Sequence, residues 1–230
     1  MTLPLTVSDE VRALAPGFTH VAVEAHGLTN GPSTEGTSAL LDDAARRLAG
    51  RLDGRAPHED PHMAAWREVY TAFGSKPSRT RNSAEALARR ALSDAGLPRI
   101  NLLVDLYNAV SVARLIPVGG EDIDRVSGGM RLVRAAGDEE FETVADGAGT
   151  VEHPDAGEVV WRDAVGVTCR RWNWRQGPRT RLTERSTSAI FLLEGLAPLP
   201  VPALGAAAAE LAELLEKFSP GAHVTVHAPV

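Results

Sequence analysis

The spacing of apolar and polar positions along the chain predicts a mixture of helices and strands. Phe18–Ala25 alternates with a period of two, which predicts a half-buried strand. Ser38–Leu52 has apolar residues at helical spacing after Thr37 or Ser38, either of which can cap a helix. Similar spacing predicts helices over Met63–Phe73, over a segment that starts at the Asn82–Glu85 capping box and runs to Ala95, over Ile100–Arg114 and over Ala203–Lys217.

From residue 130 onward the pattern changes mainly to strands. Short alternating stretches bounded by Gly, Asp and Pro are typical of antiparallel sheets. Strands are expected over Met130–Ala135, Glu140–Ala145, Glu158–Arg162, Val165–Trp172, Ser188–Leu193 and Ala222–His227. The pairs Gly119-Gly120 and Gly128-Gly129 are interpreted as turns. Helices early and strands late predict an α+β fold rather than alternating βαβ units.

Length and composition are those of an ordinary globular protein, with 230 residues, 43% of them hydrophobic and 23% charged. We expect an N-terminal strand and helical layer (residues 1–97) packed on a core formed by residues 98–230, in one compact domain. No apolar run reaches the roughly 20 residues that span a bilayer. Met1–Leu5 lacks the features of a signal peptide, and the single cysteine, Cys169, excludes an internal disulfide. These features predict a cytoplasmic protein that does not bind membranes.

Basic residues are concentrated in two windows of an acidic chain. Trp161–Arg185 has a net charge of +5 and Trp66–Arg90 one of +4, whereas the whole chain has −6. This polarity suits a protein that binds a polyanion through one surface and stays soluble through the rest. The acidic total argues against a general DNA-coating protein, so we expect no DNA partner and only local contact with any nucleic acid.

The segment Cys169–Arg181 contains five Arg and two Trp without an acidic residue. Guanidinium groups match phosphate oxygens, and indole rings can stack on bases. An edge strand with solvated Arg side chains and core-covering Trp rings is an equally good interpretation of this segment alone.

Motifs for the common cofactor-dependent and hydrolytic chemistries are missing from the sequence, including GxGxxG, GxxxxGK[ST], HExxH and GxSxG. His58 and His62 flank two acidic residues, but neighbouring Pro57 and Pro61 favour a loop over a metal site. Cys169 has no His nearby in sequence and is expected to be a small buried hydrophobe. The sequence therefore predicts no metal and no cofactor.

Several segments follow one another in a recognisable order: Leu102–Val112 (LLVDLYNAVSV), Gly128–Ala135, Glu139–Gly147, Gly157–Trp161 and Thr183–Glu194. The series covers Pro98–Leu196 and resembles the B3/B4 domain in the β subunit of bacterial phenylalanyl-tRNA synthetase. With its Arg170–Trp174 segment, the whole chain is similar to stand-alone B3/B4 proteins. In the synthetase, this domain hydrolyses tyrosine misattached to the phenylalanine tRNA. The resemblance implies a β-sandwich core with flanking helices and a pocket for the aminoacylated 3′ end of tRNA.

Editing of this kind needs a positioned water, a polarised carbonyl and a fixed ribose, but no covalent nucleophile. The resemblance implies that Asn108 holds the ester carbonyl or the ribose, although capping a neighbouring backbone group is an equally good role. Asp105 would orient Asn108 or a water. Thr183 and Thr187 would hydrogen-bond a side-chain hydroxyl or the attacking water.

Further roles concern binding. Glu184 is expected to recognise the α-amino group of the substrate. Contacts to the acceptor end are expected from Arg170, Arg171, Trp172, Asn173 and Trp174, and contacts to RNA phosphates from Lys76, Arg79, Arg81, Arg175, Arg179 and Arg181. Strand alternation places Arg170, Trp172 and Trp174 on one face and the residues between them on the other, so a common ligand requires a bulge.

The chain departs from the synthetase pattern after the Asn108 helix. Synthetase domains carry Leu-His-Ala-Phe-Asp there, whereas this chain has Val118-Gly119-Gly120-Glu121-Asp122 and lacks the His. The amino acid and tRNA therefore stay open, as does the oligomeric state. Two hypotheses remain: a trans-acting aminoacyl-tRNA deacylase, which is favoured, and a non-catalytic tRNA or amino-acid binding module. Both expect the Asp105/Asn108 helix and the Thr183/Thr187 segment to meet at one pocket rimmed by Arg and Trp.

Overall fold

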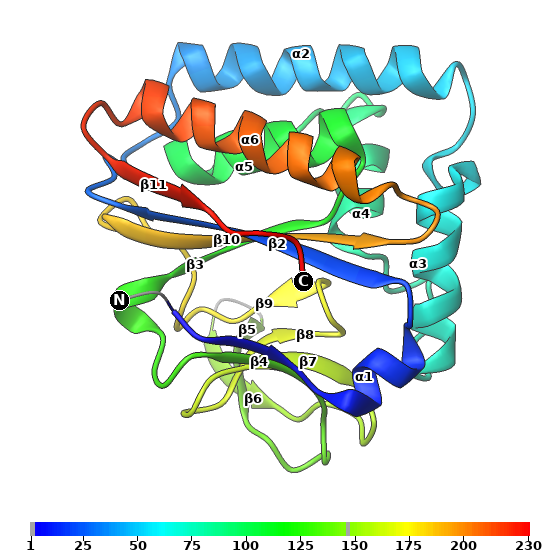
Figure 1. The fold of residues 1–230 in the computed structure, drawn as a ribbon. Coiled ribbons are helices and arrows are strands. Elements are labelled where there is room, and N and C mark those ends of the chain that lie inside the picture. Colours follow the sequence, from blue (N-terminus) through cyan, green and yellow to red (C-terminus); the bar gives the residue numbers. More distant parts are fainter. Residues whose placement is uncertain (1–2, 146–147) are drawn as a thin grey trace.

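Two sheets and a layer of helices make up the protein, whose computed structural model describes residues 3–145 and 148–230 (Figure 1). The antiparallel four-stranded sheet has the order β11 (His223–Val226), β2 (Phe18–His26), β10 (Ser188–Leu196) and β3 (Val118–Asp122). The five-stranded sheet has the order β1 (Leu5–Val7), β4 (Met130–Arg134), β7 (Val159–Arg162), β8 (Val167–Arg170) and β9 (Arg175–Gln176). Only β1 and β4 run parallel in that sheet.

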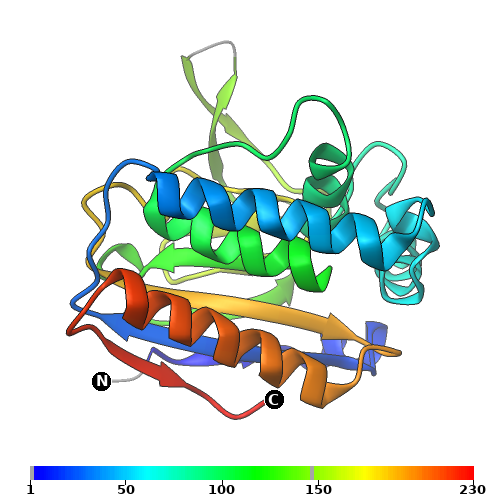
Figure 2. The ribbon, with the colours of Figure 1, turned by 90° about the horizontal axis from the view of Figure 1, so that it is seen from above.

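Helices cover the outer face of the four-stranded sheet. The helices α5 (Leu102–Arg114) and α6 (Val201–Phe218) pack on it, and α2 (Glu35–Leu52) lies on α5 (Figure 2). At one end stand α3 (Pro61–Ala72) and α4 (Ser83–Ala91), while α1 (Asp9–Leu14) follows β1. Short 3₁₀ turns form at Pro57–Glu59 and Ile123–Arg125. The predicted α+β class, with a two-sheet core and flanking helices, is confirmed.

A separate two-stranded sheet, β5 (Phe141–Ala145) with β6 (Ala148–Glu152), projects from the five-stranded sheet. The last two residues of the Glu139–Gly147 segment lie outside the described residues.

Strand β2 is buried on both faces and not on one as predicted. It pairs with β10 without interruption from Phe18↔Leu196 to Ser188↔His26. Helices cover one face of this pair and the five-stranded sheet covers the other, so both faces are shielded from water. The polar members of the alternation, among them His20 and its pairing partner Glu194, therefore point into the space between the sheets. Alternation identified the strand but could not show that its polar face is enclosed.

Two local predictions are wrong. Gly119 and Gly120 lie in β3 and not in a turn. Gly120 has no side chain because the Phe191 ring occupies that space, and not because the backbone turns there. The strand expected over Val165–Trp172 ends at Arg170, since Arg171 and Trp172 adopt left-handed backbone angles, φ +44° and +66°. This turn sends Trp172 into the core and leaves Trp174 partly exposed, so strand alternation does not apply to the segment.

Neighbouring glycines of β3 provide a stability test. A Cβ at Gly120 would lie 2.9 Å from Leu182 Cδ1 and 3.0 Å from Phe191 Cδ1, whereas one at Gly119 would meet nothing within 4 Å. We expect Gly120→Ala to lower the free energy of unfolding by about 1–3 kcal/mol through overpacking. Gly119→Ala should stay within about 0.5 kcal/mol of the wild type, because the added methyl group enters open space. Urea unfolding measures both, and equal losses would contradict the packing described for β3.

Candidate functional site

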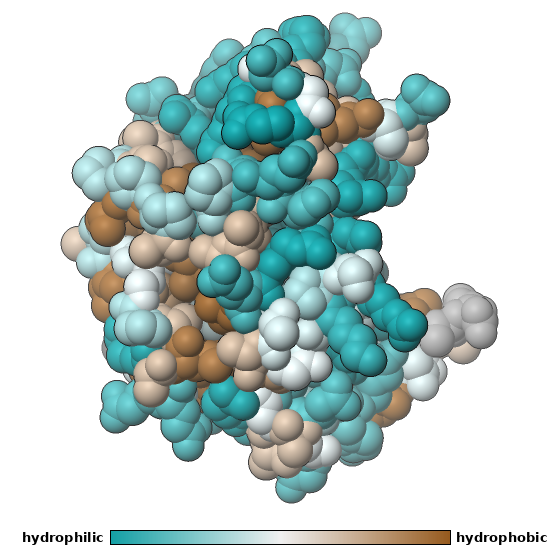
Figure 3. Space-filling view, turned by 90° about the vertical axis from the view of Figure 1, so that its right-hand side faces the viewer, coloured by the Kyte–Doolittle hydropathy of each residue, from teal (hydrophilic) through white to brown (hydrophobic). Residues whose placement is uncertain are grey.

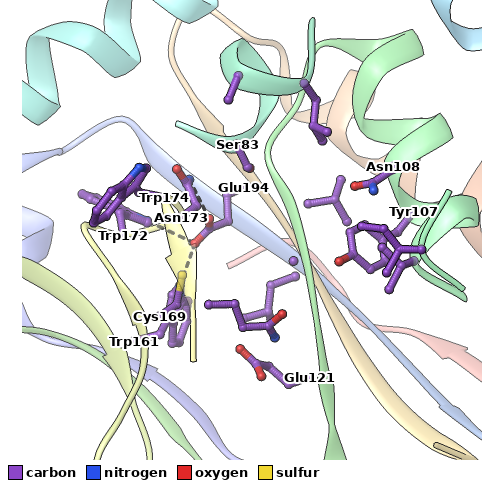
Figure 4. Close-up of a pocket in the computed structure, with 18 of the residues that line it drawn as sticks. Ser83, Tyr107, Asn108, Glu121, Trp161, Cys169, Trp172, Asn173, Trp174 and Glu194 are labelled. Atoms are coloured by element: carbon purple, nitrogen blue, oxygen red, sulfur yellow. Dashed lines mark hydrogen bonds between the residues drawn. The ribbon is translucent and has the colours of Figure 1, made fainter. Parts of the chain in front are cut away.

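A cavity of about 320 Å³ lies between the two sheets beside strand β3 (Figure 4). Strands β3, β4, β7, β8, β9 and β10 supply its floor and sides, and helices α4 and α5 close it from above. The turn at residues 172–174 supplies one wall. Most of the surface of the cavity wall is apolar or aromatic. Polar atoms are contributed by Ser83, Tyr107, Asn108, Glu121, Trp161, Cys169, Trp172, Asn173, Trp174, Gln176 and Glu194. Such a composition is typical of small-molecule sites.

Glu194 on β10 holds this wall together. Its Oε1 accepts hydrogen bonds from Trp161 Nε1 at 2.9 Å and Trp172 Nε1 at 3.1 Å, and its Oε2 accepts one from Asn173 Nδ2 at 2.9 Å. Burial raises the pKa of Glu194 to about 7, although the hydrogen bonds from the amide and the two indoles oppose this shift. The buried carboxyl thus fixes β7 and the 172–174 turn against the four-stranded sheet.

Asn173 connects this network to the helices above. Its Oδ1 accepts a hydrogen bond from the buried Tyr70 hydroxyl at 2.8 Å, and its backbone carbonyl accepts one from Ser83 N at 3.2 Å. Asn82 caps α4 by accepting from Glu85 N, so the helix begins at the cavity wall. Asn173 is therefore fixed from both sides and has little freedom to move.

Asn108 reaches the cavity from α5. Together with Ile100, Val104 and Tyr107 it forms the part of the lining that comes from this helix and the residues just before it. Its amide has no protein hydrogen bond among the described residues, so the alternative role of capping a backbone group is not seen. Of the four residues expected to be catalytic, Asn108 alone lines the cavity.

Asp105 lies elsewhere and has structural contacts. Its carboxylate accepts hydrogen bonds from Thr37 Oγ1 and Ile100 N, both at 3.0 Å, and it is fully buried against α2. Although residues three apart lie on the same side of a helix, Asp105 is sealed against α2 and, of the two, only Asn108 lines the cavity. Asp105 therefore ties α5 to α2 and does not contact the cavity.

The Thr183 segment approaches α5 without reaching the cavity. Asn30 Nδ2 donates to both Asn101 Oδ1 and the Thr183 carbonyl, which joins this loop to the start of the helix. Thr183 itself hydrogen-bonds within its own loop to Ser186, while Glu184 and Thr187 are exposed. The two segments are therefore neighbours, but the prediction that they meet at one pocket is wrong, because the side chains of Thr183, Glu184 and Thr187 do not line the cavity.

Ion pairs occupy the first two arginines of the basic segment. Arg170 is buried and donates to Glu158 and Glu152 at distances from 2.8 to 3.0 Å. Arg171 donates to Thr80 Oγ1 at 2.9 Å and lies over the Trp174 ring at 4.7 Å. Arg170 therefore stabilises the turn and is not available to RNA. Arg171 and Arg175 flank the partly exposed indole of Trp174, and the guanidinium carbon of Arg175 lies 5.8 Å from the centre of that ring.

A basic groove adjoins the cavity. It is lined by Arg79, Arg81, Ala86, Arg89, Arg90, Ser93 and Trp174, of which Ala86 and Trp174 also line the cavity. Hydrophilic side chains gather around a hollow on the face of the molecule in Figure 3. Arg81 pairs with Glu85 at 3.5 Å, while the exposed Arg79 and Arg89 have no ion pair within the described part of the chain. The groove thus presents guanidinium groups directly beside the opening.

The other basic residues predicted to bind RNA lie outside this groove. Arg175 pairs with Glu152, and Arg179 forms two short hydrogen bonds to Asp163, at 2.7 and 2.8 Å. Lys76 and Arg181 are exposed. Arg179 therefore has a structural partner already, whereas Arg79 and Arg89 present guanidinium groups, unpaired among the described residues, in the groove beside the opening.

No role had been expected for Glu121, Glu194, Trp161 or Tyr107. Glu194 interrupts an otherwise apolar strand, which was a usable signal, whereas Glu121 follows two glycines that resemble a turn. Burial raises the pKa of Glu121 to about 8.

In the described part of the chain, no three His, Cys, Asp or Glu side chains are grouped to hold a metal ion. No helix there has the length and apolar character needed to cross a membrane.

Residues 65–217 match the family model of the B3/4 domain. The chain belongs to this family. The resemblance seen in the sequence is therefore confirmed. Among solved structures, this chain is similar to an N-terminal fragment of the phenylalanyl-tRNA synthetase β subunit from Pyrococcus horikoshii, with 11% sequence identity and a TM-score of 0.44. The match covers 97% of this chain and 50% of that fragment, so the chain spans about half its length. No curated protein matches the sequence.

The two buried carboxyls of this B3/4 domain predict a pH-dependent stability. Because folding raises the pKa of Glu194 from 4.5 to about 7 and that of Glu121 to about 8, the folded state binds their protons more tightly. Their stabilising contribution is complete below pH 4.5 and is lost as pH rises through 7 to 8. Each group contributes a slope of at most about 1.4 kcal/mol per pH unit. Urea unfolding at several pH values measures the slope, which Glu121→Gln should reduce; an unchanged slope would contradict the assignment.

Proposed function

We propose that this protein hydrolyses the ester bond of a mischarged aminoacyl-tRNA in trans, with the aminoacylated 3′ end in the cavity. One observation carries the proposal: the cavity and the arginine groove share Ala86 and Trp174, so they form a continuous site. An apolar pocket beside free guanidinium groups suits a ligand with a small organic end on a phosphate backbone. The sequence resemblance to the synthetase editing domain supports the same ligand.

The cavity has the size and chemistry for an amino-acid ester. Its volume of about 320 Å³ accommodates a group of amino-acid size, and the tRNA body would lie outside it. The side-chain amide of Asn108 lies in its wall without a hydrogen-bond partner among the described residues and would stabilise the oxyanion that develops on the ester carbonyl. Burial raises the pKa of the Cys169 thiol, which disfavours it as a nucleophile. Hydrolysis by an oriented water is therefore the mechanism proposed.

The surface outside the opening would hold the nucleic acid. Arg79 and Arg89 are exposed in the groove and would bind phosphates. The Trp174 indole lies between the opening and the groove with Arg171 and Arg175 against it, which is a suitable platform for stacking the terminal base. Such a partner would place the activity in the cytoplasm.

Asn108→Ala tests the catalytic part of the proposal. We expect turnover of a mischarged aminoacyl-tRNA panel to fall by about 10²–10³, the usual effect of removing one oxyanion donor. Thr187→Ala is the matched control, because Thr187 is exposed and does not line the cavity. Full turnover in Asn108→Ala would remove Asn108 from the mechanism. Binding without turnover by the wild type across the whole panel would instead support the non-catalytic module.

The groove is tested by the salt dependence of tRNA binding. Replacing Arg89 by Ala should weaken binding and reduce the slope of log K against log [salt] by about 0.7–0.9, because one phosphate contact is lost. Arg46→Ala removes an equal charge from the exposed surface of α2, where Arg46 pairs with Asp43, and should leave the slope unchanged. Equal effects of the two substitutions would mean that the groove is not the RNA contact.

A further inference from the structure

The cavity wall contains a carboxyl group that the protein leaves partly unsatisfied. Gly119 and Glu121 line the cavity from alternate positions of β3. The Glu121 side chain is buried, with 5% of the residue exposed, and its Oε2 is sealed from solvent without a hydrogen-bond partner among the described residues. The Thr180 and Gln176 side chains lie near this carboxyl and lower its pKa, but burial outweighs them. Figure 4 shows this carboxyl group below Cys169, within the same cavity as Glu194. A buried acceptor without a partner costs free energy unless a ligand supplies the donor.

No positive charge inside the cavity compensates this carboxyl. Of the described residues that line the cavity, none is Lys, Arg or His, and Glu194 adds a second acidic group. Arg179 is the cation that acts on Glu121, but its guanidinium group is bound to Asp163. Arg181 faces β3 only through a backbone bridge to Glu121, and its side chain is exposed. The remaining titratable neighbours, Tyr107 and Cys169, are neutral because burial raises the pKa of both.

The rest of the lining favours a cation with an apolar stem. Trp161, Trp172, Trp174 and Tyr107 surround the cavity, and the faces of such rings attract ammonium and guanidinium groups. Leu192, Met130 and Val118 supply apolar contacts for methylene groups. Glu194 is already satisfied by three N–H donors, whereas the carboxyl of Glu121 accepts no hydrogen bond within geometric limits from the described residues. Glu121 is therefore the group at which a ligand cation would be bound.

We propose that the cavity selects amino acids with a cationic side chain, and that Glu121 determines this selectivity by pairing with the ammonium or guanidinium group. The proposal rests on the proposed function, since it names the aminoacyl group that the same site would accept. It also gives a physical reason for the acidic group of Glu121, unpaired among the described residues, in an apolar cavity: the substrate supplies the missing positive charge.

The test uses two non-hydrolysable analogues of the aminoacylated 3′ end, 3′-lysylamino-adenosine and 3′-norleucylamino-adenosine. They have side chains of nearly the same length and differ in the terminal ammonium group. We expect the wild-type protein to bind the lysyl analogue at least about tenfold more tightly, as measured by calorimetry at pH 8, because an ion pair in an enclosed site is screened less than one in water. Glu121→Gln should abolish this ratio and leave the affinity for the norleucyl analogue unchanged.

The pH dependence gives a second measurement that needs no variant. Burial raises the pKa of Glu121 to about 8, so the empty site is protonated below that pH and must lose the proton to pair with a cation. The lysyl ammonium stays charged throughout, with a pKa of about 10.4. The ratio of lysyl to norleucyl affinity should therefore fall by up to about tenfold per unit as pH is lowered from 8 to 6. Taking the ratio cancels the titration of the α-amino group, which both analogues share.

Each outcome separates this inference from the proposed function. Equal binding of the two analogues by the wild type, or a ratio that is retained in Glu121→Gln, would overturn the inference and leave the proposed function standing. Failure of both analogues to bind would overturn the proposed function and the inference with it. If Glu121→Gln fails to fold in a thermal-unfolding control, the wild-type pH series decides, since a ratio independent of pH would also overturn the inference.

Discussion

The buried carboxyl of Glu194 is the interaction on which the arrangement of the site depends. It accepts hydrogen bonds from one indole on β7 and from an indole and an amide in the 172–174 turn, while its own backbone belongs to the opposite sheet. Two facing sheets normally meet through apolar side chains, and apolar packing is tolerant of small displacements. A carboxyl with three directed N–H donors is less tolerant, because a displaced donor would leave a buried polar group unsatisfied. The distance between the sheets, and with it the cavity, is fixed by this group.

The basic segment has two physical roles that its composition does not separate. Arg170 and Arg179 are bound to acidic residues and hold the turns around β8. Arg171 and Arg175 also pair with acidic residues, but they lie against the Trp174 ring near the surface. Both interpretations of this stretch therefore hold for part of it: some of its arginines and Trp172 belong to the core, and others face outward beside the opening. The free charge is supplied instead by the 79–90 segment, which the chain brings to the same opening from far away in sequence.

Sequence patterns were sufficient for the long elements and insufficient for the short ones. Helices α2, α3 and α5 and strands β2 and β10 have strong periodicity and clear caps, so their existence followed from local physics. Strands β1, β3 and β9 are short or rich in glycine, and pairing with neighbours creates them. For the site, Asn108 and the residues Trp172–Trp174 could be found from the sequence resemblance, whereas the turn at Trp172 and the role of Glu121 could not. Its importance comes from burial between sheets, which no local pattern records.

The open space at Gly119 has a consequence for how this fold can diversify. Leu182 and Phe191 pack against Gly120, but Gly119 lines the cavity and a Cβ added there would meet no atom within 4 Å. Larger residues at this one position could narrow the chamber while the framework that supports it stays the same. Substrate preference in such a scaffold can therefore drift by single substitutions on an edge strand, without the loss of stability that changes in a packed interior usually bring.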